Sequence, residues 1–265
     1  MILLDKDKLV SHIRDQDVKF SMLKNLDIIE NVLFNYEIKQ TKFLNPYETI
    51  NLTAILRGIQ NISFHSDGGF EASERKLIYI YPDYYSEENI ASEITVLKIT
   101  GNFKYKEVSH RDYLGSILSL GITRENIGDI CVNKDGVYVF VLKSMKDYIL
   151  YNLSKVSNVS VKIQEIDLKE FSYEEPDLEE VFLTVTSPRI DALIAAAFNL
   201  SREKSQTIIK NENVRVDYEI INSNSKILDG NNIVSVKGFG RFIYVDKLGE
   251  TKKNRTKILI KKYRK

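Results

Sequence analysis

The period of the hydrophobic pattern changes along the 265 residues, and this change limits the folds that the chain can adopt. Apolar side chains near the start recur every three or four positions, at Val18, Met22, Leu26, Ile29 and Leu33. This spacing predicts an amphipathic helix. From residue 77 onward, runs of β-branched and aromatic residues alternate with short helical patterns. The predicted fold class is therefore α+β.

Three segments follow from this pattern. Residues 1–75 are predicted to form an N-terminal helical region, in which Pro46 occupies the first turn of a second helix and residues 66–69 form a loop. Residues 76–180 are predicted to form an α+β domain, in which residues 133–135 join two strands as a hairpin and helices cover 109–120 and 146–153. Residues 186–265 are predicted to form two short helices followed by short strands, the last of them basic. The acidic run at 174–180 is either a linker or a turn before a strand over 181–185.

The net charge of +1 conceals a strong asymmetry. Residues 186–265 contain 17 Lys and Arg against 8 Asp and Glu, a net charge of +9, whereas residues 1–185 have a net charge of −8. A basic segment of this kind is typical of a module that binds a polyanion. The acidic part would repel a polyanion and is a candidate surface for a protein partner.

Composition excludes several classes of protein. Cys131 is the only cysteine, so an internal disulfide or a cysteine-based metal cluster is excluded. His12 and His65 are too isolated in the sequence to suggest a metal site, and no cofactor is predicted. No apolar run approaches the ~20 residues that span a bilayer, and the start shows no secretory leader. We therefore expect a soluble cytoplasmic protein without a membrane partner.

The second of the two short C-terminal helices carries the candidate binding site. Arg202, Gln206 and Lys210 are four residues apart and share one helix face. Ser201, as N-cap, starts a helix whose free N–H groups favour phosphate, and a phosphate there would offset the unfavourable position of Arg202 in the first turn. Asp191 is predicted to orient Arg189 or a helix end. The candidate phosphate-binding residues on this surface are Arg189, Ser201, Arg202, Lys204, Gln206, Lys210, Arg215, Lys237 and Arg241.

This segment resembles the S-four RNA-binding domain, also called the alpha-L motif. The resemblance lies in residues 188–193, 200–205, 208–210, 214–217 and 230–241. The sequence departs from the family pattern where glycine is usual, at Asn211-Glu212-Asn213 and at Asp217-Tyr218. Because Asn and Asp tolerate the left-handed backbone, we expect these turns to be retained.

The whole layout, with residues 109–115 and 237–242, resembles the bacterial YlmH family. The resemblance implies an RRM-like middle domain, binding to the large ribosomal subunit with contacts to ribosomal RNA and tRNA, and a role in ribosome-associated quality control of stalled nascent chains. In the middle domain Tyr138 and Phe140 alternate to one side, where RNA bases stack in RRM domains, although packing against a helix is favoured. His110 and Arg111 are possible secondary contacts, or Arg111 pairs with Asp112 at a helix start.

Enzyme motifs are incomplete. His110-Arg111-Asp112 lacks the Asn that a kinase catalytic loop places five residues after the Asp. Pseudouridine synthases carry the S-four domain before the catalytic one, and a leucine separates their catalytic Arg and Asp; neither holds here. The first hypothesis is thus a non-catalytic RNA-binding protein that docks on the ribosome. The alternative is an RNA-modifying enzyme, pseudouridine-synthase-like, that uses the middle domain around Asp112. Under the first hypothesis, Arg189→Ala with Arg202→Ala would weaken RNA binding and change the unfolding midpoint little.

Overall fold

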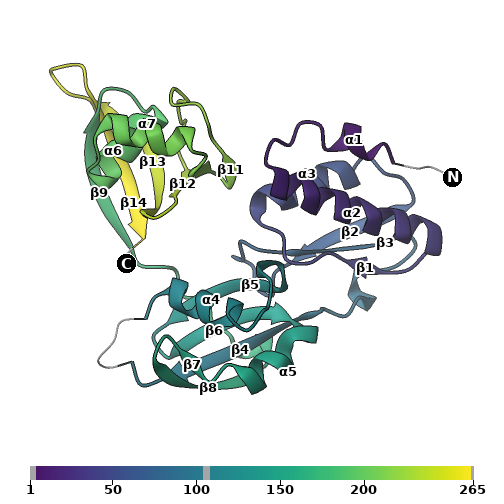
Figure 1. Cartoon of the computed structure of the whole chain (residues 1–265). Coiled ribbons are helices and arrows are strands. Elements are labelled where there is room, and N and C mark those ends of the chain that lie inside the picture. The colour runs from purple at the N-terminus through teal and green to yellow at the C-terminus, as the bar shows by residue number, and fades with distance from the viewer. Residues whose placement is uncertain (1–3, 104–107, 264–265) are drawn as a thin grey trace. The chain divides into compact units, whose positions relative to one another are not determined.

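The computed structural model describes residues 4–103 and 108–263 and divides the chain into two compact units, Met1–Glu175 and Pro176–Lys265 (Figure 1). Both units combine helices with antiparallel sheets, so the α+β fold class is confirmed. None of the helices within the described ranges combines the length and the apolar composition that a membrane crossing requires.

The N-terminal part of the first unit combines three helices with a small sheet, and the two longer helices pack on that sheet. The helices are α1 (Lys6–Leu9), α2 (Gln16–Asn35) and α3 (Pro46–Leu56), and the strands β1 (Lys39–Gln40), β2 (Ile62–Asp67) and β3 (Leu77–Pro82) are ordered β1-β3-β2. The Asn45 side chain accepts from the Glu48 amide and the Glu48 carboxylate accepts from the Asn45 amide, a capping box that starts α3. The predicted loop at 66–69 begins two residues later than expected, because Ser66 and Asp67 still pair with β3.

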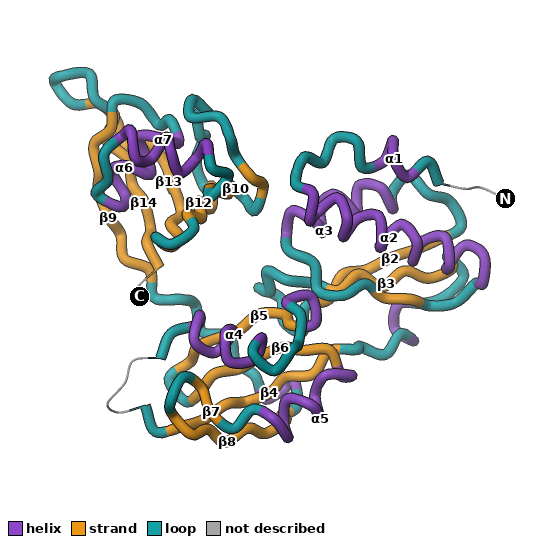
Figure 2. Tube along the Cα trace, viewed as in Figure 1, coloured by secondary structure: helices purple, strands orange, loops and turns teal. Residues whose placement is uncertain are grey.

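The middle part forms a five-stranded antiparallel sheet ordered β5-β6-β4-β8-β7. Its strands are β4 (Ile94–Gly101), β5 (Ile127–Asn133), β6 (Gly136–Leu142), β7 (Lys155–Val156) and β8 (Val159–Ile166). Helices α4 (His110–Leu118) and α5 (Lys143–Asn152) pack on the face that carries Leu97, Ile99 and Val139. Short helical turns η1 (Glu87–Asn89), η2 (Arg124–Asn126) and η3 (Leu168–Glu170) lie in the connections (Figure 2). The predicted β5–β6 hairpin is confirmed.

The second unit is a six-stranded antiparallel sheet with two helices on one face (Figure 1). The strand order is β11-β10-β12-β13-β14-β9. The elements are β9 (Leu178–Val185), α6 (Ile190–Phe198), α7 (Arg202–Lys210), β10 (Val214–Val216), β11 (Glu219–Ile220), β12 (Asn232–Val236), β13 (Gly240–Glu250) and β14 (Thr256–Tyr263). The acidic run thus leads into β9, whose Glu180 pairs with Lys261 of β14.

A close contact joins the N-terminal and middle parts of the first unit. The ring of Phe43, which is 1% exposed, lies against Gly128 of β5, where an added Cβ would come within 2.7 Å of the Phe43 ring and 3.1 Å of the Phe140 Cβ. We expect Gly128→Ala to lower the free energy of unfolding of this unit by about 1–3 kcal/mol through overpacking.

Urea unfolding checks this expectation, and Gly115→Ala is the matched control. A Cβ at Gly115 in α4 meets nothing within 4 Å, so alanine there should be neutral or stabilise by up to about 1 kcal/mol through helix propensity. Equal effects of the two substitutions would contradict the packing argument.

Candidate nucleic-acid interface

A buried carboxylate organises the start of both helices of the second unit. Asp191, in the first turn of α6, is 0% exposed and accepts hydrogen bonds from three side chains. Arg189 donates through Nε and Nη2 at 3.2 Å each, and Arg202 donates through Nε at 3.1 Å and Nη2 at 3.4 Å. Gln206 donates through Nε2 at 3.0 Å. One carboxylate therefore holds two guanidinium groups and an amide in fixed positions. We call Arg189, Asp191, Arg202 and Gln206 the Asp191 cluster.

Local sequence signals bring these groups together. Asn199 ends α6 in the left-handed conformation with φ 52°, and Ser201 caps α7 by accepting from the Lys204 amide at 3.2 Å. Arg202 and Gln206 then lie one turn apart on the side of α7 that faces α6, while Ile209 is buried in the core.

The cluster keeps a net positive charge and remains open to solvent. Burial alone would raise the pKa of Asp191, but hydrogen bonds from Arg202, Gln206 and Arg189 outweigh it, so that this pKa lies below its ordinary value. The ionised carboxylate cancels only one of the two guanidinium charges. The side chains of Arg189 and Arg202 are 34% and 46% exposed. Their remaining N–H groups can donate to an external anion such as phosphate.

Other predicted site residues lie near the same helix. Lys204 and Lys210 are exposed on α7, and the Lys204 ammonium lies 5.8 Å from the centre of the Phe239 ring. Lys237 is exposed in the turn between β12 and β13, and its amide donates to the Asn213 carbonyl just after α7. These lysines add positive charge around α7.

Arg215 and Arg241 do not extend this surface. Arg215 of β10 is opposite Ser235 of β12, which is opposite Arg241 of β13, so the three side chains share one face of the sheet. Val214 and Val216 on either side of Arg215 are buried in the core with α6 and α7. Because side chains alternate along a strand, both arginines face away from the helices. The expectation of one continuous surface is corrected: the nine predicted residues lie on two faces of this unit.

The departures from the glycine pattern are accommodated in the backbone. Glu212, Asp217 and Tyr218 adopt positive φ angles of 57°, 48° and 71°. The Asp217 carboxylate accepts from the Ile233 amide at 2.8 Å and from the Asn232 side-chain amide at 2.7 Å, which fixes the turn. The left-handed turns expected there are present.

In the middle part, the candidate residues divide between surface and core. His110 and Arg111 are exposed at the start of α4. The Asp112 carboxylate accepts from the Ser109 amide at 2.8 Å and the Ser109 hydroxyl at 2.6 Å, so it caps this helix. The Asp112 carboxylate is thus engaged at the start of α4.

Tyr138 and Phe140, the residues at the RRM-like stacking position, are 5% and 0% exposed. The Phe171 ring packs on both at 5.1 and 5.0 Å between centroids, and the Phe70 ring packs on Phe140 at 4.8 Å. The expected packing is confirmed, but loop aromatics cover these residues where a helix was expected.

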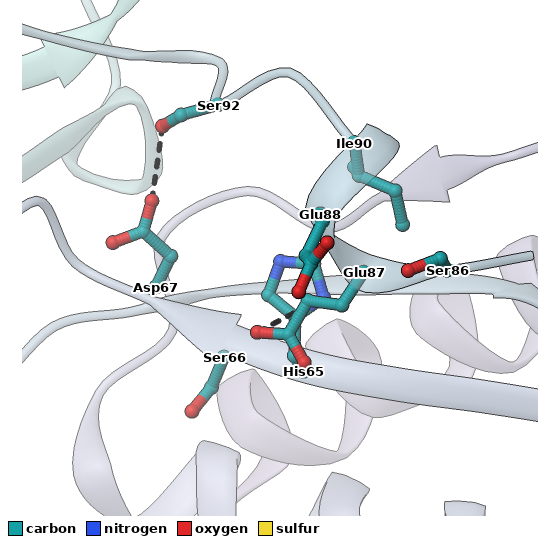
Figure 3. A pocket seen from close by; sticks show the side chains of 8 residues that line it. All are labelled: His65, Ser66, Asp67, Ser86, Glu87, Glu88, Ile90 and Ser92. Carbon is teal, nitrogen blue, oxygen red and sulfur yellow. Dashed lines mark hydrogen bonds and ion pairs between the residues drawn. The ribbon is translucent and has the colours of Figure 1, made fainter.

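A cavity of about 670 Å³ in the first unit has an acidic lining that includes Asp67, Glu87 and Glu88 (Figure 3). His65 contributes to its wall, stacks on Tyr79 at 4.8 Å between ring centroids, and has Nδ1 4.0 Å from a Glu87 oxygen. No sequence pattern indicates this cavity, because its lining comes from two separate stretches, 65–67 and 86–92. Its carboxylates would repel phosphate, so we do not assign it to RNA.

Comparison with known proteins supports the assignment of a family. Residues 18–85 match a family model described as "YlmH, N-terminal", and residues 88–170 match one described as "Putative RNA-binding domain in YlmH". A protein of Bacillus subtilis (strain 168), named ribosome-associated protein quality control protein P2, is 30% identical over 223 residues, which cover 84% of this chain and 86% of that protein. The chain belongs to the YlmH family.

The resemblance predicted from the sequence is therefore confirmed, and a solved structure agrees with the fold. The cell division protein ylmH from Streptococcus pneumoniae superposes with a TM-score of 0.52 at 24% sequence identity. The match covers 60% of this YlmH-family chain and 96% of that one, and it shows a shared fold alone.

Proposed function

We propose that this YlmH-family chain is a non-catalytic RNA-binding protein that acts on ribosomes in the cytoplasm. The observation that carries the proposal is the Asp191 cluster, which fixes two part-exposed guanidinium groups on a unit whose residues 186–265 have a net charge of +9. Such groups match the charge and geometry of phosphate oxygens. The name of the Bacillus subtilis relative supports a ribosomal setting.

In finer terms, the proposed site is the S-four domain of the second unit, and its partners are ribosomal RNA and tRNA on the large subunit. Arg189 and Arg202 would contact backbone phosphates, with a phosphate near the start of α7 offsetting the unfavourable first-turn position of Arg202. Contacts of this kind position a protein on folded RNA without reading its sequence. The proposed role is rescue of stalled nascent chains.

The first unit is assigned a different part in this proposal. Its residues, Met1–Glu175, include 21 Lys and Arg against 26 Asp and Glu, a net charge of −5, so this unit is better suited to a protein partner than to phosphate. Burial raises the pKa of the Cys131 thiol to about 12, which disfavours a nucleophilic thiolate. Mass spectrometry of ribosomal RNA from cells with and without the gene tests the non-catalytic assignment, since an enzyme would leave a base modification that disappears on deletion.

Lys204→Ala with Lys210→Ala tests the RNA site without disturbing Asp191. Both lysines are exposed on α7, so folding should be unaffected. For each phosphate that the variant no longer neutralises, the slope of log affinity against log salt concentration should fall by about 0.7–0.9. Cosedimentation with purified large and small ribosomal subunits across a salt series measures this slope and the subunit preference.

The matched control is Lys8→Ala with Lys24→Ala, which removes two positive charges from the N-terminal part. We expect the control to bind as the wild type does. If both double variants bind large subunits with the same slope and affinity, α7 is not the RNA site.

A further inference from the structure

The sheet of the second unit has one face that neither α6 nor α7, the two helices that the structure describes in this unit, covers. The helices α6 and α7 pack on the face that carries Val234, Phe242 and Ile258 (Figure 1). Along each strand, the side chains that point to the other face of the sheet alternate with these core residues. We call this other face the open sheet face, and we define it by six of its residues: Phe182, Arg215, Arg241, Lys257, Lys261 and Tyr263. All six are at least partly exposed to solvent.

An exposed aromatic ring lies between two lysines on this face. Phe182 of β9 is 68% exposed and pairs directly with Leu259 of β14. Lys257 and Lys261 are two positions before and after Leu259, and therefore point to the same side as Phe182. The Lys261 ammonium lies 3.4 Å from the Glu180 carboxylate, while Lys257 is exposed. The β9–β14 strand pair thus displays an exposed ring with a lysine on either side.

A second aromatic and cationic group lies further along the same face. The guanidinium carbon of Arg241 is 5.5 Å from the centre of the Tyr218 ring and 5.0 Å from that of Tyr263. Arg241 also donates to the Tyr218 hydroxyl at 2.9 Å, and Arg215 donates to the Tyr218 carbonyl at 3.0 Å. Tyr218 therefore holds both arginines in place across the sheet.

The charge on this face favours a polyanion. This face carries four cations, Arg215, Arg241, Lys257 and Lys261, and two carboxylates on the same side of the strands. The carboxylates are Glu180, which is paired with Lys261, and Asp246. Exposed aromatic rings interleaved with basic residues are the surface on which unpaired bases stack. A duplex would bury its bases away from such a ring, whereas a single strand presents them.

We propose that the open sheet face binds an unpaired RNA strand, with a base stacked on Phe182 and backbone phosphates beside Lys257 and Lys261. This site is on the opposite side of the sheet from the Asp191 cluster. The proposal rests on the proposed function only in taking RNA as the partner. With this second site, the unit would have separate surfaces for folded RNA and for unpaired RNA.

Fluorescence anisotropy with a labelled oligouridylate of about 12 nucleotides and the full chain tests the proposal. Phe182→Ala should weaken binding about tenfold, because the base no longer has a ring to stack on. Phe182→Tyr should bind as the wild type does. Phe182→Leu should bind as weakly as Phe182→Ala, since leucine keeps apolar area but has no ring.

Lys257→Ala with Lys261→Ala tests the phosphate contacts. This variant should reduce the slope of log affinity against log salt concentration for the single strand by about 1.4 in total. Leu248→Ala, at a 51% exposed position on β13, is the control and should change nothing.

The outcomes separate this proposal from the proposed function. Failure of the wild type to bind the oligonucleotide, unchanged affinity of Phe182→Ala, or equal affinity of Phe182→Leu and the wild type each overturns base stacking at this face. Loss of ribosome binding by Phe182→Ala with unchanged oligonucleotide affinity would instead identify a protein docking surface. The ratio of the Phe182→Ala affinity to that of its parent should be the same in the Lys204→Ala with Lys210→Ala background as in the wild type, so a failure of the α7 site leaves this test intact.

Discussion

Arg189→Ala with Arg202→Ala should destabilise the second unit by about 3 kcal/mol. The double substitution leaves the carboxylate of Asp191, 0% exposed, with the Gln206 amide as its remaining donor in the cluster. A buried charge without its counter-charges is costly because it also lacks hydration. The expectation from the sequence that this variant would unfold at nearly the wild-type midpoint is therefore revised.

The effect of pH distinguishes this mechanism from a simple loss of packing. In the wild type the pKa of Asp191 is lowered on folding, so its stabilising contribution is present above the unfolded pKa of about 3.9 and is lost as pH falls through the lower folded value. In the double variant burial acts without the guanidinium groups and should raise this pKa. Lowering the pH from about 7 toward about 4 should then stabilise the double variant relative to the wild type.

Hydrogen exchange of peptides from α6 and α7 across a urea series measures the opening free energy of this unit separately from the first. Adding Asp191→Asn to the double variant should recover much of the stability, because the stranded charge is removed. Lys204→Ala with Lys210→Ala removes two charges from the same helix and should change stability by less than about 0.5 kcal/mol. A double variant as stable as this control, at both pH values, would show that Asp191 needs no counter-charge.

The turn between α6 and α7 and the start of α7 could be predicted from the sequence because their signals are local. Ser201 and Asn199 specify a cap and a left-handed turn within a few residues of each other. The Asp191 cluster needs more than this: Arg202 and Gln206 reach Asp191 across 11 and 15 residues, and only the packing of α6 on α7 brings them together. The link from Asp191 to Arg189, two residues apart, was the part that the sequence predicted.

The two-sided distribution of the candidate residues had a signal in the sequence. Arg215 alternates with Val214 and Val216, and strand alternation places it opposite the core. The expectation that Arg215 joins the cations of α7 considered its charge alone and ignored the two-residue period of side chains along a strand.

The strands β1 and β2 of the N-terminal part had a weaker signal in the sequence. Strand β1 has only two residues, and β2 becomes a strand only by pairing with β3, which follows it after a loop.

Phe140→Ala should lower the free energy of unfolding of the first unit by about 3–5 kcal/mol and leave RNA affinity unchanged. The ring is 0% exposed and contacts Phe70 and Phe171, and a Cβ at Gly69 would come within 2.6 Å of it. Alanine would leave a cavity where three segments of the unit meet: strand β6, the loop after β2, and the stretch after η3. Residues at the same position in an RRM domain are free to stack on bases, so the same substitution there would lower RNA affinity with little effect on folding.

Urea unfolding and RNA binding of the same variant decide between these two roles. Binding is measured at a temperature where the variant is fully folded, so that unfolding does not imitate a weaker affinity. Phe140→Leu keeps most of the volume and should recover much of the stability. Tyr151→Ala, at an 87% exposed position on α5, should change stability by less than about 0.5 kcal/mol and serves as the surface control. A stable Phe140→Ala with weakened RNA binding would mean that Phe70 and Phe171 move aside to expose this face; the packing of both rings on Phe140 argues that they stay.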